Sequence, residues 1–142
     1  FIDELTKIRR GPAITHPRDI GLIITTTGIG KESRVLDAGS GSGLLSSYLS
    51  NVGCKVYSYE VNKEFFKIAQ LNHKDLGLEV ELKNKDIHKG IEENGLDLVI
   101  LDLPDPWNTL KHVHKALKNG AFLVCYLPTI TQISKLVKNL DS

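Results

Sequence analysis

Glycines and small polar residues are concentrated in one short segment, Val35-Leu36-Asp37-Ala38-Gly39-Ser40-Gly41-Ser42-Gly43, which begins as an apolar stretch. Glycine allows the backbone to approach a ligand closely and to adopt positive φ angles. The helix expected after this loop presents free N–H groups at its first turn. In an open α/β sheet, the first strand-to-helix loop is a usual position for a nucleotide-like ligand. The segment therefore predicts such a binding loop, with a purely structural turn as the alternative.

The residues around the loop indicate which ligand it suits. The dinucleotide fingerprint GxGxxG requires glycine at position 44 or 46, but Leu44 and Ser46 stand there. Asp37, two residues before the first glycine, suits a cationic ligand better than a pyrophosphate. S-adenosylmethionine (SAM) carries an ammonium and a sulfonium group and no phosphate. The loop thus favours SAM over a nicotinamide dinucleotide, and an NAD-dependent oxidoreductase is the disfavoured alternative.

Three further carboxylates are expected at the ends of predicted strands. Glu60 follows the glycine loop by about twenty residues, the spacing at which an acid can accept hydrogen bonds from two ribose hydroxyls. Asp86, at the end of the third strand, can accept a hydrogen bond from an adenine amine, and Asp102 comes at the end of the fourth. The alternatives are ordinary surface or turn carboxylates, and for Asp102 a residue that caps a helix or braces a loop.

The apolar runs predict five strands that alternate with helices. Three of these strands are rich in Val, Ile and Leu without clean alternation, which is typical of parallel strands buried on both faces. The pattern favours a doubly wound α/β sheet in which residues 1–142 form one domain, with residues 1–16 as a lead-in segment. The expected strands are Arg34–Ala38, Lys55–Val61, Val80–Lys85, Leu96–Leu103 and Ala121–Leu127.

Proline, glycine and capping residues predict where helices begin and end. Pro17 suits the first turn of one helix, and Asn62 is expected to N-cap another. A helix through Leu110 and Leu117 is expected to stop at Asn119-Gly120. Thr131 is expected to cap the last helix, which carries apolar residues on one face.

Cysteines and histidines give no sign of a metal site, because they show no CxxC spacing and no Cys/His cluster. We interpret Cys54 and Cys125 as buried reduced thiols, which fits a cytoplasmic location. Four of the five histidines are expected on helix or loop surfaces, without partners or catalytic roles: His73, His88, His112 and His114.

Together these segments resemble the class I SAM-dependent methyltransferases, and the fourth strand narrows the resemblance. The segment Leu98–Trp107 (LVILDLPDPW) is similar to that of the tRNA (adenine-N1)-methyltransferases, which modify the T-loop adenine conventionally numbered 58 and, in archaea, sometimes its neighbour. Three other segments agree in the same order: Arg10–Asp19, Val56–Glu60 and Tyr126–Gln132. The family usually has Tyr where this chain has His16.

The resemblance implies a Rossmann-like sheet of strand order 3-2-1-4-5, with the final strands of the fold missing from this sequence. It implies SAM as cofactor, S-adenosylhomocysteine as product, and Asp102 as the catalytic carboxylate that binds the target adenine. His16 and Tyr126 are expected to wall the pocket, since aromatic rings stack on a displaced base, although His16 also suits a loop-bracing role. The expected cofactor-binding residues are Asp37, Gly39, Ser40, Gly41, Ser42, Gly43, Leu44, Glu60, Val61, Asp86, Ile87 and Asp102.

Composition is that of a folded domain, with 41% hydrophobic and 25% charged residues. No apolar run reaches the roughly 18 residues needed to span a bilayer. The chain contains no Met, and we interpret it as a fragment of a longer protein. The net charge of +1 creates no strong field, but basic residues are in excess in residues 1–34 and 103–142, which suits contacts with RNA. The expected partner is tRNA, and the resemblance implies a homo-oligomer, a tetramer.

Several alternatives to this function are open. Another class I methyltransferase, acting on protein isoaspartate or on a small molecule, shares the glycine loop. An amino-N6 methyltransferase would show a Pro-Pro-aromatic motif where Pro104–Trp107 stands. A non-catalytic partner subunit keeps the fold but loses the cofactor loop, and the intact segment Asp37–Gly43 argues against it.

Overall fold

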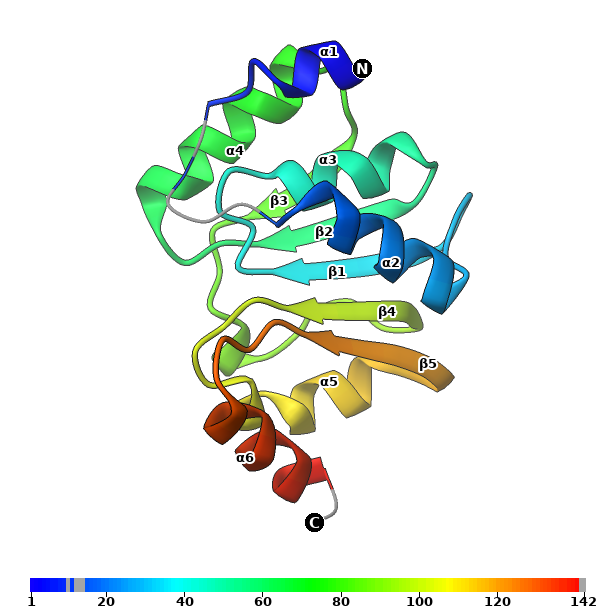
Figure 1. The fold of residues 1–142 in the computed structure, drawn as a ribbon, viewed down its shortest axis with the longest axis vertical. Coiled ribbons are helices and arrows are strands. Elements are labelled where there is room, and N and C mark those ends of the chain that lie inside the picture. Colours follow the sequence, from blue (N-terminus) through cyan, green and yellow to red (C-terminus); the bar gives the residue numbers. More distant parts are fainter. Residues whose placement is uncertain (10, 12–14, 141–142) are drawn as a thin grey trace.

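The sheet of the protein is entirely parallel and has the order β3-β2-β1-β4-β5 (Figure 1). The computed structural model describes residues 1–9, 11 and 15–140. The strands are β1 (Arg34–Ala38), β2 (Lys55–Tyr59), β3 (Val80–Lys83), β4 (Leu96–Leu101) and β5 (Leu117–Cys125). The doubly wound α/β fold predicted from the sequence is confirmed, including the strand order that the family resemblance implied.

Helices connect most of the strands; the β3–β4 connection has a short 3-10 turn instead, and a second 3-10 turn precedes the helix between β4 and β5. The helices are α1 (Ile2–Leu5), α2 (Pro17–Thr27), α3 (Leu44–Asn51), α4 (Lys63–Asp75), α5 (Leu110–Ala116) and α6 (Ile130–Leu140), and the 3-10 turns are η1 (Ile87–Lys89) and η2 (Pro106–Asn108). As predicted, α2 begins at Pro17, and the Asn62 side chain caps α4 by accepting from two backbone N–H groups. None of the helices in the described ranges is both long and apolar enough to cross a bilayer.

Two apolar clusters hold the layers together. On one face of the sheet, Ile20 and Ile23 of α2 and Leu49 of α3 pack against Val56 and Ile100. On the other face, η1 and α5 contribute Ile87, Val113 and Ala116, which pack against β1 and β4. The central strands β1 and β4 are therefore covered on both faces, and their carboxyl ends open onto a single edge of the sheet.

Several predicted boundaries were wrong by a few residues. Strands β2, β3 and β4 each end two residues earlier than predicted, so Glu60, Asp86 and Asp102 lie in the loops that follow. The helix before β5 stops at Ala116, and Asn119-Gly120 belongs to β5, where they accommodate an irregular register against β4. The last helix is capped by Thr129 and not by Thr131, because the Thr129 hydroxyl accepts from the Gln132 N–H.

Candidate functional site

The loops that follow β1, β2 and β4 are joined by backbone hydrogen bonds at the carboxyl edge of the sheet. The N–H groups of Gly39 and Ser40 donate to the carbonyl of Tyr59, at 2.9 and 3.3 Å. The N–H of Asp102 donates to the carbonyl of Ala38 at 2.9 Å. These bonds continue the strand ladder past its last paired residues and bring the predicted glycine loop beside Asp102.

Gly39 is the position in the loop where a side chain has no room. Its φ is +91°, and a Cβ built there would lie 2.4 Å from the carbonyl oxygen of Asp102. Real side chains do not tolerate such a contact, and positive φ adds strain for any residue but glycine. Glycine at this position therefore lets the loop pack directly against the backbone of Asp102. Next to Gly39, the buried Ser40 hydroxyl has no hydrogen-bond partner among the described residues, so it is available to bind a ligand.

Glu60 braces the glycine loop from the end of β2. Its Oε2 accepts from the Gly41 N–H at 2.9 Å, and its Oε1 accepts from the Asn62 N–H at 2.8 Å. The side chain is buried, with 6% of the residue exposed. Each carboxylate oxygen has two acceptor positions, so both oxygens can still accept a hydrogen bond from a ligand hydroxyl.

Asp37 is the most buried carboxylate of the site, with 1% of its surface exposed. Its pKa is raised from an ordinary 3.8 to about 7, mainly by burial; the hydrogen bond from Ser58 lowers it, and the nearby charges of Asp102 and Glu60 raise it. The Ser58 hydroxyl donates to Asp37 Oδ2 at 3.3 Å. An acid in this setting gains from a cation, because a positive charge offsets both the burial and the neighbouring carboxylates.

We predict that Asp37 makes stability fall as the pH rises. The folded protein keeps a proton on Asp37 up to about pH 7, whereas the unfolded chain releases it near the ordinary pKa of 3.8. The free energy of unfolding should therefore decrease between about pH 4 and 7, by up to about 4 kcal/mol from this group. Asp37→Asn should abolish that decrease in urea titrations, whereas Asp3→Asn, at an exposed site, should not. An unchanged pH dependence in Asp37→Asn would contradict the prediction.

A pocket of about 270 Å³ opens between the β2, β3 and β4 exit loops. Five of the predicted cofactor-binding residues line it: Gly39, Glu60, Val61, Asp86 and Ile87. Of the other predicted residues, Asp37, Ser40, Gly41, Ser42, Gly43 and Leu44 lie on β1, in the adjoining loop and at the start of α3. The predicted residues are thus assembled along one continuous edge, from the glycine loop to the β3 exit.

His88 bridges the β3 and β4 exit loops at the wall of this pocket, contrary to the expectation that it has no partner. Its Nδ1 lies 2.7 Å from Asp86 Oδ1, and its Nε2 lies 3.1 Å from Asp105 Oδ1. Both ring nitrogens can donate to these carboxylates only when the ring is protonated. The hydrogen bond to Asp86 accordingly raises the pKa of His88, and that to Asp105 adds to it. His112 was likewise expected to lack a partner, but its Nε2 contacts the carbonyl of His88.

Two residues of α4 support the glycine loop from behind, and sequence analysis missed both. The Asn72 side chain donates to the carbonyl of Ser42 at 2.9 Å. His73, expected on the surface, is buried; its Nε2 lies 2.9 Å from the Ser46 hydroxyl and 2.6 Å from a Cβ built at Gly43. Burial lowers the pKa of His73, which keeps the ring neutral. Because Asn72 and His73 are adjacent polar residues, they follow no apolar helix period. Only the packing of α4 against the loop reveals their supporting role.

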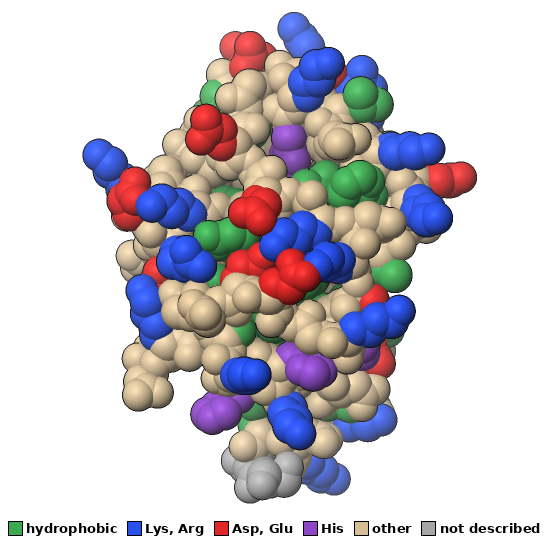
Figure 2. All heavy atoms as spheres, turned by 180° about the vertical axis from the view of Figure 1, so that it is seen from behind, with side chains coloured by type: hydrophobic (Ala, Val, Ile, Leu, Met, Phe, Trp, Pro, Cys, Tyr) green, Lys and Arg blue, Asp and Glu red, His purple; other side chains and the backbone are tan. Residues whose placement is uncertain are grey.

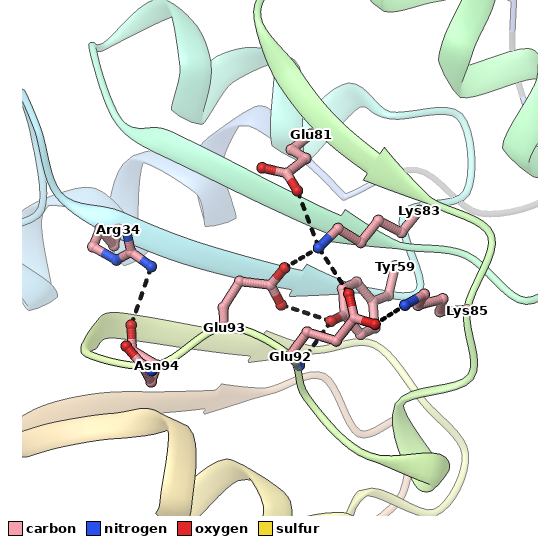
Figure 3. Close-up of polar contacts among 8 residues, drawn as sticks. All are labelled: Arg34, Tyr59, Glu81, Lys83, Lys85, Glu92, Glu93 and Asn94. Atoms are coloured by element: carbon pink, nitrogen blue, oxygen red, sulfur yellow. Dashed lines mark hydrogen bonds and ion pairs between the residues drawn. The ribbon is translucent and has the colours of Figure 1, made fainter.

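A polar network joins the β3–β4 connection to residues of β2 and β3 (Figure 3). The Tyr59 hydroxyl donates to Glu93 Oε2 at 2.6 Å and accepts from the Glu92 N–H at 3.1 Å. Lys83 reaches into the same network and pairs with Glu93, Glu92 and Glu81. Because the Tyr59 carbonyl also accepts from the glycine loop, this network fixes the position of the loop indirectly.

The three residues predicted to be catalytic lie in different surroundings. Asp102 is exposed at the end of β4, although partial desolvation of its carboxyl raises its pKa. Tyr126 follows β5, and its N–H donates to the carbonyl of Leu101. Burial raises the pKa of Tyr126 to about 12, and the charges of Asp19, Asp102 and Asp37 act in the same direction.

His16 is exposed and accepts from the Arg18 N–H through Nδ1, as the N-cap of α2. Its predicted loop-bracing role is therefore supported by a contact, and its stacking role stays a prediction. Part of the lead-in segment around it, Arg10 and residues 12–14, lies outside the described residues.

The loop after Asp102 is anchored to α6. The Gln132 side chain donates to the carbonyl of Pro104 at 3.2 Å, and Lys135 Nζ lies 4.3 Å from the centre of the Trp107 ring. Trp107 thus packs the loop onto a helix. Of the two cysteines, Cys54 is buried as predicted, whereas Cys125 is only half-buried, and both are free thiols.

Comparison with known proteins identifies close relatives of this arrangement. Residues 7–142 match the model of the family described as tRNA methyltransferase complex GCD14 subunit. The chain is 36% identical, over 99% of its length, to tRNA (adenine(57)-N(1)/adenine(58)-N(1))-methyltransferase TrmI of Methanocaldococcus jannaschii. It spans 61% of that relative's length.

Two solved structures have the same fold and more than 30% identity. The tRNA (m1A58) methyltransferase TrmI of Aquifex aeolicus superposes with a TM-score of 0.88 at 34% identity. The superposition covers 98% of this chain and 58% of the Aquifex aeolicus chain. A SAM-dependent O-methyltransferase of Thermotoga maritima superposes with a TM-score of 0.90 at 34% identity. The superposition covers 99% of this chain and 54% of the Thermotoga maritima chain. The chain therefore spans about 54 to 61% of the length of these three proteins.

Proposed function

Because the chain belongs to the tRNA methyltransferase complex GCD14 subunit family, we propose that it is the catalytic region of an enzyme that forms 1-methyladenosine in the T-loop of tRNA, with SAM as cofactor. The observation that carries the proposal is the assembly of Asp37, Glu60 and Asp102 around the Gly39 backbone at one edge of the sheet. In this proposal, Asp37 supports a cationic ligand, Glu60 binds hydroxyl groups, and Asp102 provides an exposed carboxylate at the same edge of the sheet.

The residues present fit SAM. Asp37 lies where a buried carboxylate benefits from the ammonium group, and Glu60 has acceptor positions left for the ribose hydroxyls. Gly39 lines the pocket, and its lack of a side chain lets the loop pack directly against the Asp102 backbone. At the β3 exit, Asp86 and Ile87 line the pocket where an adenine ring would lie, and Val61 also lines it.

When bound, SAM supplies an electrophilic methyl group. Adenine N1 has an in-plane lone pair, so the chain need not provide a strong base before the attack. Its residues must instead align N1 with the methyl carbon and exclude water. As the N1–C bond formed and the bond from the methyl carbon to the sulfonium sulfur broke, S-adenosylhomocysteine would leave and positive charge would spread over the adenine ring and its exocyclic amine. Asp102 would stabilise that charge by accepting a hydrogen bond from the amine. Tyr126 and His16 wall the base on either side.

The proposal extends to assembly and location. The RNA substrate is tRNA, whose T-loop base must leave its stack to reach Asp102. The protein is proposed to act as a homo-oligomer, a tetramer, in the cytoplasm.

Nucleoside mass spectrometry tests the function directly. Unmodified tRNA is incubated with the protein and SAM, digested and analysed for methylated nucleosides. We expect 1-methyladenosine, with none in the absence of SAM. If S-adenosylhomocysteine binds in calorimetry but no methylated nucleoside appears, the tRNA assignment is wrong while the cofactor assignment stands. In that case hydroxyl-bearing small molecules and isoaspartyl peptides are the substrates to assay next, since the Thermotoga maritima neighbour is an O-methyltransferase.

A further inference from the structure

We propose that the lysines of α5 and α6 form a docking surface for the phosphate backbone of the RNA substrate. This surface, the α5–α6 basic face, consists of Lys111, Lys115, Lys135 and Lys138. The proposal rests on the proposed function and names the part of the chain that meets the RNA outside the pocket.

Charge is distributed very unevenly along the chain. Residues 106–140 contain five Lys and no Asp or Glu, whereas residues 1–105 contain thirteen Lys or Arg against sixteen Asp or Glu. A net charge of +1 for the whole chain therefore conceals +5 on one segment. A local field of one sign attracts a polyanion even when the molecule as a whole is nearly neutral.

The fold places this segment at one end of the molecule. Helices α5 and α6 both pack against η2, and they lie at the end of the sheet opposite α4 (Figure 1). Seen from behind, the lower end of the molecule shows blue and purple side chains, whereas the red ones gather higher up (Figure 2). The segment without Asp or Glu thus contributes both α5 and α6 to this end of the molecule.

The lysines of this face are available to a ligand. Lys111, Lys115 and Lys138 are exposed, and no ion pair formed within the described residues includes any of them. Elsewhere in the described chain, four Lys or Arg side chains form ion pairs, for example Lys55 with Glu32 and Lys85 with Glu92. Within the segment itself, Lys118 pairs with Asp97 and is therefore excluded from the proposed face.

The face also reaches the rim of the site. Lys135 lies over the Trp107 ring, and Gln132 binds the Pro104 carbonyl, two residues after Asp102. A phosphate backbone held on α6 would therefore lie next to the loop that carries the catalytic carboxylate. An acidic protein is the rival partner for such a face, and the test below separates the two.

The test compares two triple variants with the same change of charge. In the first variant, Lys111, Lys115 and Lys138 are replaced by Gln. In the second, Lys63, Lys67 and Lys74 of α4 are replaced by Gln; these three lysines are also exposed and form no ion pair within the described chain. Binding of fluorescently labelled unmodified tRNA is measured against salt concentration, and SAM binding by calorimetry. We expect the α5–α6 variant to raise the dissociation constant for tRNA at least about 10-fold and to lower the log–log salt slope by about 2 to 3. The α4 variant should change neither, and SAM affinity should be unchanged in both.

Equal effects of the two variants on tRNA binding would overturn the proposal, because net charge alone would then explain them. Loss of SAM binding in the α5–α6 variant would overturn it as well, by showing a disturbed fold. If the wild-type protein binds tRNA but produces no 1-methyladenosine, the proposed function fails while the comparison of variants still decides the docking surface. If tRNA does not bind at all, both fail, and an acidic protein becomes the partner to assay.

Discussion

Asp102→Ala should lower the rate of methyl transfer to tRNA by about 100- to 1000-fold, the usual cost of removing one group that stabilises developing charge. The exposed Asp102 carboxyl follows β4, and its backbone is held by the hydrogen bond to the Ala38 carbonyl. Removing the carboxyl therefore leaves the loop in place. SAM affinity, measured by calorimetry, should stay within about threefold of the wild-type value if the carboxyl acts mainly on the target base.

Asp105→Ala is the matched control for this experiment. Asp105 is a carboxylate three residues further on, and its oxygens contact His88 and the Asn108 side chain. The Asp105→Ala variant should reduce the turnover number much less than Asp102→Ala does. An equal loss of SAM binding and turnover in Asp102→Ala would assign Asp102 to the cofactor alone and remove its catalytic role.

Glu60→Ala should weaken SAM binding by about 10- to 100-fold, because hydrogen bonds to a charged carboxylate contribute more than neutral ones. The variant loses both the acceptor positions for the ribose and the two bonds that hold the Gly41 and Asn62 N–H groups. Calorimetric titration with S-adenosylhomocysteine measures the effect. Glu64→Ala, an exposed acid in the first turn of α4, is the control and should bind normally.

A ligand lacking the ribose hydroxyls separates the two contributions of Glu60. The wild-type protein should prefer S-adenosylhomocysteine to its 2′,3′-dideoxy analogue, and Glu60→Ala should lose that preference. If the variant keeps the full preference, Glu60 only braces the loop and another group binds the ribose.

Much of this site was predictable because its signals are local. The Gly39–Gly43 loop, the Pro17 start of α2 and the Asn62 cap of α4 each depend on the conformation of a few neighbouring residues, which the residue types specify. Glu60 and Asp102 could be placed near the ends of strands, although β2 and β4 both end two residues earlier than predicted. The strand order came from the family resemblance, since spacing alone does not determine which strands pair.

What sequence reasoning missed depends on contacts between distant segments. His73 and Asn72 look like surface residues in a polar stretch of α4, yet they pack against the glycine loop about thirty residues earlier. His88 looks unpartnered until the β4 exit brings Asp105 to it. Asn119-Gly120 is an ordinary helix stop, but pairing with β4 draws both residues into β5. In each case tertiary packing overrides a local preference.

The two outer strands of the sheet differ in how they resist association with other chains. An outer strand leaves backbone N–H and C=O groups open to further pairing, and charged side chains or irregularities protect against it. On β3, Glu81 and Lys83 supply charge. On β5, the irregular first half carries Lys118, but Ala121–Cys125 has neither charge nor proline, and Phe122 is 44% exposed. In preparations of this chain, aggregation by strand addition should therefore begin at the second half of β5, which is the place to introduce a lysine for solubility.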